Sequence, residues 1–136
     1  MQKSRTSRAS SRPPRLILTG DCENGKYIIE LDGVQVGLSK GSFATLLRFI
    51  HARICTPRGV LQLDRMKAKR LRDAIDDAFG NKRVSREIIR VADKHEYRLV
   101  INLADIANRK SFRDFVAAKR IDPTLGENIF RACSEV

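Results

Sequence analysis

The chain has 136 residues, the size of a single domain with one hydrophobic core. It carries 27 lysines and arginines against 16 aspartates and glutamates, and the formal net charge of +11 favours nucleic acid or another acidic partner over a small neutral substrate. No apolar run reaches the ~18 residues of a membrane span, and the three cysteines lack metal-ligand spacing, so we expect a cytoplasmic protein with free thiols and without a metal or a cofactor.

The first 14 residues are rich in serine, arginine, threonine and proline and almost free of apolar side chains, which predicts a disordered basic arm. Residues 1–15 hold five basic and no acidic side chains. Residues 16–136 still hold 22 basic and 16 acidic side chains, so the folded part is basic without the arm.

An antiparallel meander is predicted next. Residues 16–18 form a short apolar run and residues 26–31 also read as a strand, with a polar turn between them. Asp32-Gly33 is a strong hairpin signal before a third run that contains Val34 and Val36.

The first helix is predicted from Ser39, a good N-cap residue. Apolar residues follow at spacings of three and four, the period of one helical face. They are Phe43, Leu46, Leu47, Ile50 and Ile54. His51 lies beside this stripe and is interpreted as a histidine at the edge of the core.

A short second helix is predicted over residues 57–63. Thr56 is a typical N-cap, and Pro57 suits the first helical position. Gly59 disfavours a helix here because glycine lowers helix propensity.

A third helix is predicted over residues 65–79, ended by Gly80-Asn81. Its first eight residues hold five cations, while Ala68, Leu71 and Ile75 form an apolar face. Cations at the N-terminal end oppose the helix dipole, which a phosphate-facing role would explain. A plain solvated face is the alternative.

A hairpin is predicted over residues 88–101. Two β-type runs, 88–91 and 97–101, flank a polar tip at Asp93-Lys94-His95-Glu96. His95 is interpreted as a surface residue of this tip.

Four motifs resemble the DNA-binding effector domains of the OmpR/PhoB response-regulator type. They are Gly33–Ser39 followed by Phe43, Thr56–Leu61, Arg70-Leu71-Arg72 and Tyr97-Arg98-Leu99. The resemblance implies an α+β winged helix-turn-helix over residues 15–101, with an N-terminal meander, three helices and a β-hairpin wing. It also implies a sequence-specific transcription regulator that binds duplex DNA through its third helix. We expect the domain to occur here without a receiver domain.

On this resemblance, seven cations on the basic helix and the wing are the expected DNA contacts. They are Arg65, Lys67, Lys69, Arg70, Arg72, Lys94 and Arg98. Arg72 matches a position that often pairs internally, so an ion pair and a DNA contact are equally open for it.

The extension over residues 102–136 is predicted to be helical. Its apolar side chains either pack on the core or form a homodimer or partner interface. They are Phe112, Phe115, Val116, Ile129 and Phe130. No catalytic motif is recognisable, so we do not expect an enzyme. A protein-interaction module of the same fold and an RNA-binding protein are the alternative functions.

Overall fold

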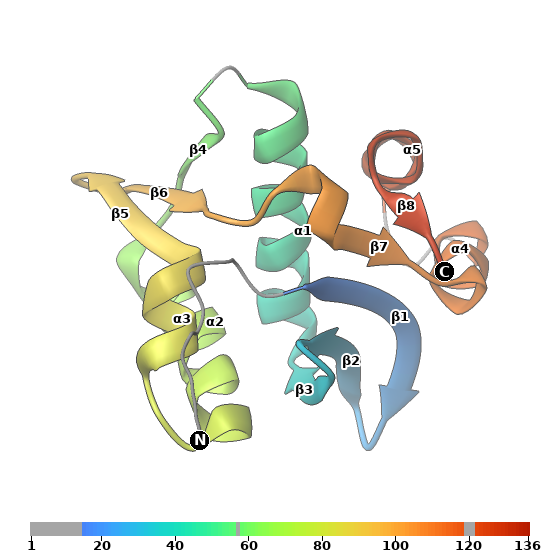
Figure 1. Ribbon diagram of the computed structural model, residues 1–136, viewed down its shortest axis with the longest axis horizontal. Helices are drawn as coiled ribbons and strands as arrows, with labels where there is room; N and C mark the ends of the chain where they lie inside the picture. Colours follow the sequence, from blue (N-terminus) through green and yellow to red (C-terminus); the bar gives the residue numbers. More distant parts are fainter. Residues whose placement is uncertain (1–14, 57, 119–121) are drawn as a thin grey trace, which may run out of the picture.

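The computed structural model describes residues 15–56, 58–118 and 122–136 (Figure 1). The predicted basic arm and Pro57 lie outside these ranges. Within the described residues, helices and two sheets share a buried core, so the predicted α+β class is confirmed.

The predicted meander is present. Strands β1 (Leu16–Glu23), β2 (Lys26–Leu31) and β3 (Val34–Leu38) pair antiparallel in sequence order. At the β2–β3 turn Asp32 and Gly33 have φ values of 51° and 81°. Two consecutive positive φ values are typical of a type I′ turn, whose twist matches that of the strands it joins.

Helix α1 (Lys40–Cys55) begins where the sequence predicts. The Ser39 hydroxyl accepts a hydrogen bond from the Ser42 amide at 3.2 Å. Phe43, at the start of the predicted stripe, and Ile50, two turns further along it, are both buried.

The predicted second helix is wrong. Residues after Gly59 form a short strand, β4 (Val60–Gln62), which pairs antiparallel with β6 (Glu96–Leu99). Gly59 has a φ of +65°, which is outside the right-handed helical region. Because its partner strand is more than thirty residues away, the local sequence does not reveal this pairing.

The basic helix α2 (Arg65–Phe79) has the predicted bounds and ends at Gly80 in the left-handed conformation. An unpredicted helix, α3 (Arg83–Ile88), lies between the basic helix and the predicted hairpin. The predicted hairpin follows as β5 (Ile89–Asp93) and β6, so α3, and not α2, is the helix directly before it.

The extension is partly helical, as predicted, but it also completes the first sheet. Strand β7 (Ile106–Asn108) pairs parallel with β1, and β8 (Ser134–Glu135) pairs parallel with β7. Helices α4 (Lys110–Ala117) and α5 (Pro123–Ala132) lie between them in the chain. The five-stranded sheet has the order β3-β2-β1-β7-β8, and the smaller sheet has the order β4-β6-β5.

The extension packs on the core, one of the two roles predicted for it. Phe112 and Ile129 are fully buried in the same cluster as residues of β1 and α1. The Phe112 ring meets that of Phe43 edge to face, with centroids 6.4 Å apart, and that of Phe130 at 5.7 Å.

Figure 1 shows α1 in the middle of the molecule, with the small sheet, α2 and α3 on one side and β7, α4 and α5 on the other. In the part of the chain that the structure describes, none of the helices has the length and apolarity that a membrane crossing requires.

Candidate nucleic-acid interface

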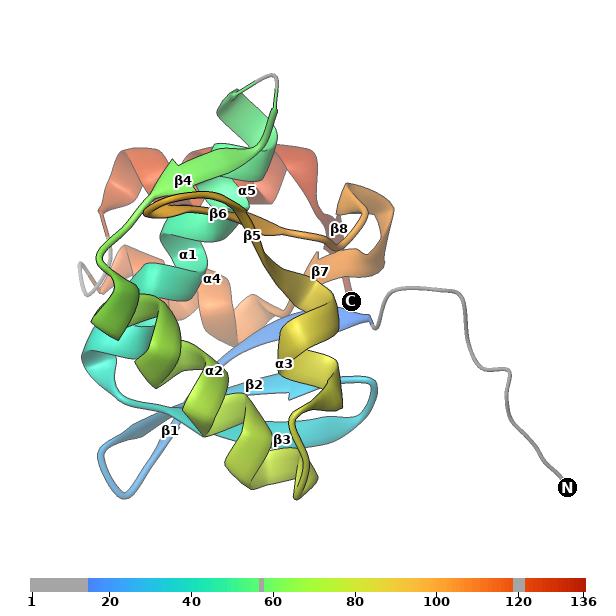
Figure 2. The same ribbon diagram turned by 90° about the vertical axis from the view of Figure 1, so that its left-hand side faces the viewer.

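Helices α2 and α3 and the β5–β6 hairpin enclose a cleft of about 600 Å³. Figure 2 shows the two helices beside each other, with β5 continuing directly from α3. Six cations and three carboxylates line the cleft, so its side chains carry a positive excess. The cations are Arg65, Lys69, Arg72, Lys82, Arg86 and Lys94, and the carboxylates are Asp73, Asp76 and Asp93.

The helical period sets which charges of α2 reach this cleft. Arg65, Lys69 and Arg72 follow one another at spacings of four and three and therefore share a face. Leu71 and Ile75 point into the core on another face. Four of the seven predicted DNA contacts therefore line this cleft. They are Arg65, Lys69 and Arg72 of α2 and Lys94 of the hairpin tip.

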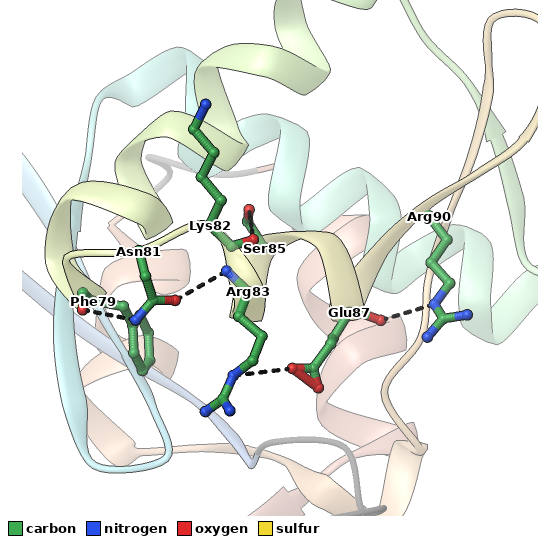
Figure 3. Close-up of polar contacts among 7 residues, drawn as sticks. All are labelled: Phe79, Asn81, Lys82, Arg83, Ser85, Glu87 and Arg90. Carbon is green, nitrogen blue, oxygen red and sulfur yellow. Dashed lines mark hydrogen bonds and ion pairs between the residues drawn. The ribbon is translucent and has the colours of Figure 1, made fainter.

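A three-residue turn, residues 80–82, positions α3. The Asn81 amide donates to the Phe79 carbonyl at 3.2 Å, and its side-chain oxygen accepts from the Arg83 amide at 2.9 Å (Figure 3). The buried Ser85 hydroxyl donates to the Asp76 carboxylate of α2. These bonds hold α3 in a fixed orientation against α2.

Helix α3 presents cations on two sides. Lys82 and Arg86, four residues apart, line the cleft. Arg83 instead pairs with Glu87 at 3.6 Å, and both of these side chains are substantially exposed. Figure 3 shows the Lys82 amine pointing away from the Arg83–Glu87 pair.

Arg72 joins α2 to the hairpin. Its guanidinium donates to the Ile89 carbonyl and lies over the Tyr97 ring, 5.7 Å from the ring centroid. Its Nε is buried, and it has no hydrogen-bond partner among the described residues. The sequence left two roles open for Arg72, an internal ion pair and a DNA contact. In the structure its internal contacts are with a backbone carbonyl and an aromatic ring.

The acids of the cleft have local partners or local roles. Asp73 pairs with Lys69 at 2.7 Å on the exposed surface, where an ion pair contributes little to stability. At the hairpin tip the Asp93 carboxylate accepts from the Lys94 amide at 2.7 Å, and His95 has a φ of 58°. Asp93 therefore helps to form the tight turn that presents Lys94.

The other three predicted contacts lie elsewhere. Lys67 and Arg70 line a separate hollow of about 230 Å³ beside α1, together with Arg48. Arg98 lines a third hollow with Arg53 and other residues. The predicted set is therefore divided among three surfaces.

Lys82 and Arg86 were not among the predicted contacts, because no helix was predicted between the basic helix and the hairpin over residues 88–101. The sequence pattern that could have indicated α3 is weak. Val84 and Ile88, four residues apart, suit one face of a short helix, and Asn81 suits a turn before it.

The histidines and cysteines form no metal site, since no cluster of three potential ligands occurs within the described ranges. His51 Nε2 lies 3.0 Å from the Asn128 amide nitrogen and 3.3 Å from the Cys55 sulfur, at the edge of the core. All three cysteines are free. Burial raises the pKa of the Cys133 thiol to about 11, which keeps this thiol protonated at neutral pH.

Comparison of the chain with protein-family models, with curated proteins and with solved structures gave no significant match.

Proposed function

We propose that the chain is a winged helix-turn-helix protein that binds duplex DNA, with α2 and α3 as the helix-turn-helix and the β5–β6 hairpin as the wing. The observation that carries the proposal is the cleft at which α2, α3 and the hairpin tip bring six cations together. The three-residue turn between the helices, with left-handed Gly80, suits a helix-turn-helix connection.

In this proposal the second helix of the motif enters the major groove. That helix is α3, so the groove-facing candidates are Lys82, Arg83 and Arg86 in place of the first half of α2. Arginine reads guanine through paired hydrogen bonds to O6 and N7, which gives Arg83 and Arg86 a route to sequence specificity. Arg65, Lys69 and Lys94 contact phosphates at the flanks and add affinity without specificity. Transcription regulation is the role that fits such binding.

Fluorescence anisotropy on a labelled duplex tests the proposal. If about four phosphates are contacted, affinity falls roughly 100-fold between about 50 and about 200 mM salt. The comparison variant is Lys82→Gln/Arg86→Gln, and its matched control is Lys110→Gln/Arg131→Gln, which removes two exposed cations from α4 and α5. Weaker binding by the first variant alone supports the proposal. Absence of duplex binding at low salt overturns it.

A protein-interaction role is the second candidate, favoured by Val91. This apolar side chain lines the same cleft and is 61% exposed, so a partner could cover it. A stable complex with another protein that survives Lys82→Gln/Arg86→Gln and is lost with Val91→Ser would favour it over DNA. Competition between duplex DNA and structured RNA separates the third candidate, an RNA-binding role.

A further inference from the structure

Three arginines from separate parts of the chain surround a hollow of about 400 Å³. Arg53 belongs to the last turn of α1, Arg58 to the turn before β4, and Arg98 to β6. Leu99 and Val100 complete the lining. No carboxylate is among the described residues that line this hollow, in contrast to the cleft between α2, α3 and the hairpin.

This hollow lies on the other face of the small sheet from the cleft. Successive residues of a strand point to opposite faces. Tyr97 lies against Arg72 of α2 and lines the cleft, so its neighbour Arg98 points away from it. Arg90 is directly opposite Arg98 in the β5–β6 register, which adds a fourth arginine to this face.

Arg53 is held in place without using its full hydrogen-bonding capacity. Arg53 Nε donates to the Ile101 carbonyl at 3.1 Å. Its side chain packs beside Gly59, where an added Cβ would lie 3.4 Å from Arg53 Cδ. Across the described ranges, none of Arg53, Arg58, Arg90 and Arg98 forms an ion pair with a carboxylate.

Such an arrangement favours an oxyanion. Like charges placed opposite each other on neighbouring strands destabilise a sheet, and among the described residues neither Arg90 nor Arg98 forms an ion pair that would offset their repulsion. A guanidinium presents a planar fork of donors that matches a phosphate group. A bound phosphate would neutralise the repulsion and accept hydrogen bonds from more than one arginine.

We propose that Arg53, Arg58 and Arg98 form a second nucleic-acid contact, a binding site for a backbone phosphate on the face of the small sheet opposite the cleft. This inference rests on the proposed DNA binding and assigns that function an additional anchoring surface. The nucleic acid is then held on both faces of the hairpin, by the cleft on one and by the arginine site on the other.

Arg58→Gln/Arg98→Gln tests the site and leaves Arg53, which packs against Gly59, in place. Anisotropy on duplex DNA is measured over a range of salt concentrations, because the slope of log affinity against log salt changes by about 0.9 for each phosphate contact. The variant is expected to lose about one unit of slope. Lys110→Gln/Arg131→Gln removes the same charge and is expected to keep the wild-type slope. Circular dichroism confirms that each variant folds.

A second measurement detects phosphate without DNA. Inorganic pyrophosphate is titrated into the wild-type protein and the side-chain Nε–H signals of Arg58 and Arg98 are followed by NMR. They are expected to shift, and to shift equally in Lys82→Gln/Arg86→Gln.

The outcomes separate the two proposals. If Lys82→Gln/Arg86→Gln weakens DNA binding while Arg58→Gln/Arg98→Gln keeps the wild-type slope, the cleft stands and the arginine site is refuted. Pyrophosphate shifts at Arg58 and Arg98 with an unchanged DNA slope would indicate a site for a free phosphate compound, which also contradicts the backbone contact. If neither variant weakens DNA binding, both proposals fail.

Discussion

The Ser85 hydroxyl donates a hydrogen bond to the carboxylate of Asp76, across the turn that joins α2 to α3. Ser85 is 1% exposed and Asp76 is half-buried at the cleft, so this bond lies at the edge of the core. Helix α3 has six residues, too few to be stable without such tertiary contacts. The orientation of the proposed groove-facing helix therefore depends on this pair.

Ser85→Ala is expected to lower the free energy of unfolding by about 1.5 to 3 kcal/mol, the range for a hydrogen bond to a charged group. Urea denaturation followed by circular dichroism measures the loss. Ser111→Ala, at an exposed position of α4, serves as the control and should stay within about 0.5 kcal/mol of wild type. Equal stabilities of the two variants would show that the Ser85–Asp76 bond contributes nothing.

Two glycines with the same backbone conformation should respond differently to alanine. Gly20 has a φ of +77°, and an added Cβ would lie 2.4 Å from backbone atoms of Ser111 and Phe112; Gly25 has a φ of +76° with nothing within 4 Å. Gly25→Ala should cost about 1 to 2 kcal/mol from the left-handed backbone alone. Gly20→Ala should cost about 3 kcal/mol more, because β1 and α4 must move apart. Thermal unfolding of both variants checks the difference, and similar melting temperatures would contradict the close approach of these elements.

Phe112→Ala tests whether the extension is an integral part of the fold. The side chain is fully buried and meets the rings of Phe43 and Phe130. The expected loss is about 3 to 5 kcal/mol, and less for Phe112→Leu, which retains most of the apolar volume. Hydrogen exchange should show that amides of β1 lose protection together with those of α4. Loss confined to residues 102–136 would mean that the extension unfolds on its own.

Cys133 should make the free energy of unfolding depend on pH in the alkaline range. Burial raises its pKa from 9.0 to about 11, so between these values the folded state retains a proton that the unfolded state has lost. The free energy of unfolding therefore falls as pH rises from about 9 toward about 11. Comparison of wild type with Cys133→Ala isolates this contribution, which should shrink across that interval. A difference between the two proteins that is constant from pH 8 to 11 would show that Cys133 does not titrate differently on folding.

Elements whose own residues carry a periodic apolar pattern or a turn motif were predictable from the sequence. The apolar stripe that includes Phe43 and Ile50 located α1, and the Ala68–Leu71–Ile75 face located α2. Asp32-Gly33 located a hairpin turn because both residues accept positive φ. In each case the residues that carry the pattern belong to the element itself.

Strands β4 and β7 and helix α3 were not predictable, because contacts with residues outside each element determine their structure. Strand β4 has three residues and forms by pairing with β6, while β7 forms by pairing with β1. Residues 83–88 are too few for a periodic pattern, and their helix depends on the Ser85–Asp76 bond. Because α3 was not predicted from the sequence, the groove-facing role was assigned to the helix that is now α2.

The predicted set of cations did not reveal how these side chains are distributed among the surfaces of the molecule. Counting cations along α2 does not show that Lys69 faces the cleft while Lys67 faces α1. That division follows from how α2 packs between α1 and α3. Lys82 and Arg86 enter the site only through the position of α3.

The most direct measurement compares two variants that remove the same charge from the two candidate surfaces. Lys82→Gln/Arg86→Gln alters the cleft at α3, and Lys67→Gln/Arg70→Gln alters the first half of α2. Anisotropy on duplex DNA at low salt should show at least a tenfold loss of affinity for the first variant, about 1.4 kcal/mol, and a clearly smaller loss for the second. A larger loss for Lys67→Gln/Arg70→Gln would contradict the assignment of α3 as the groove-facing helix.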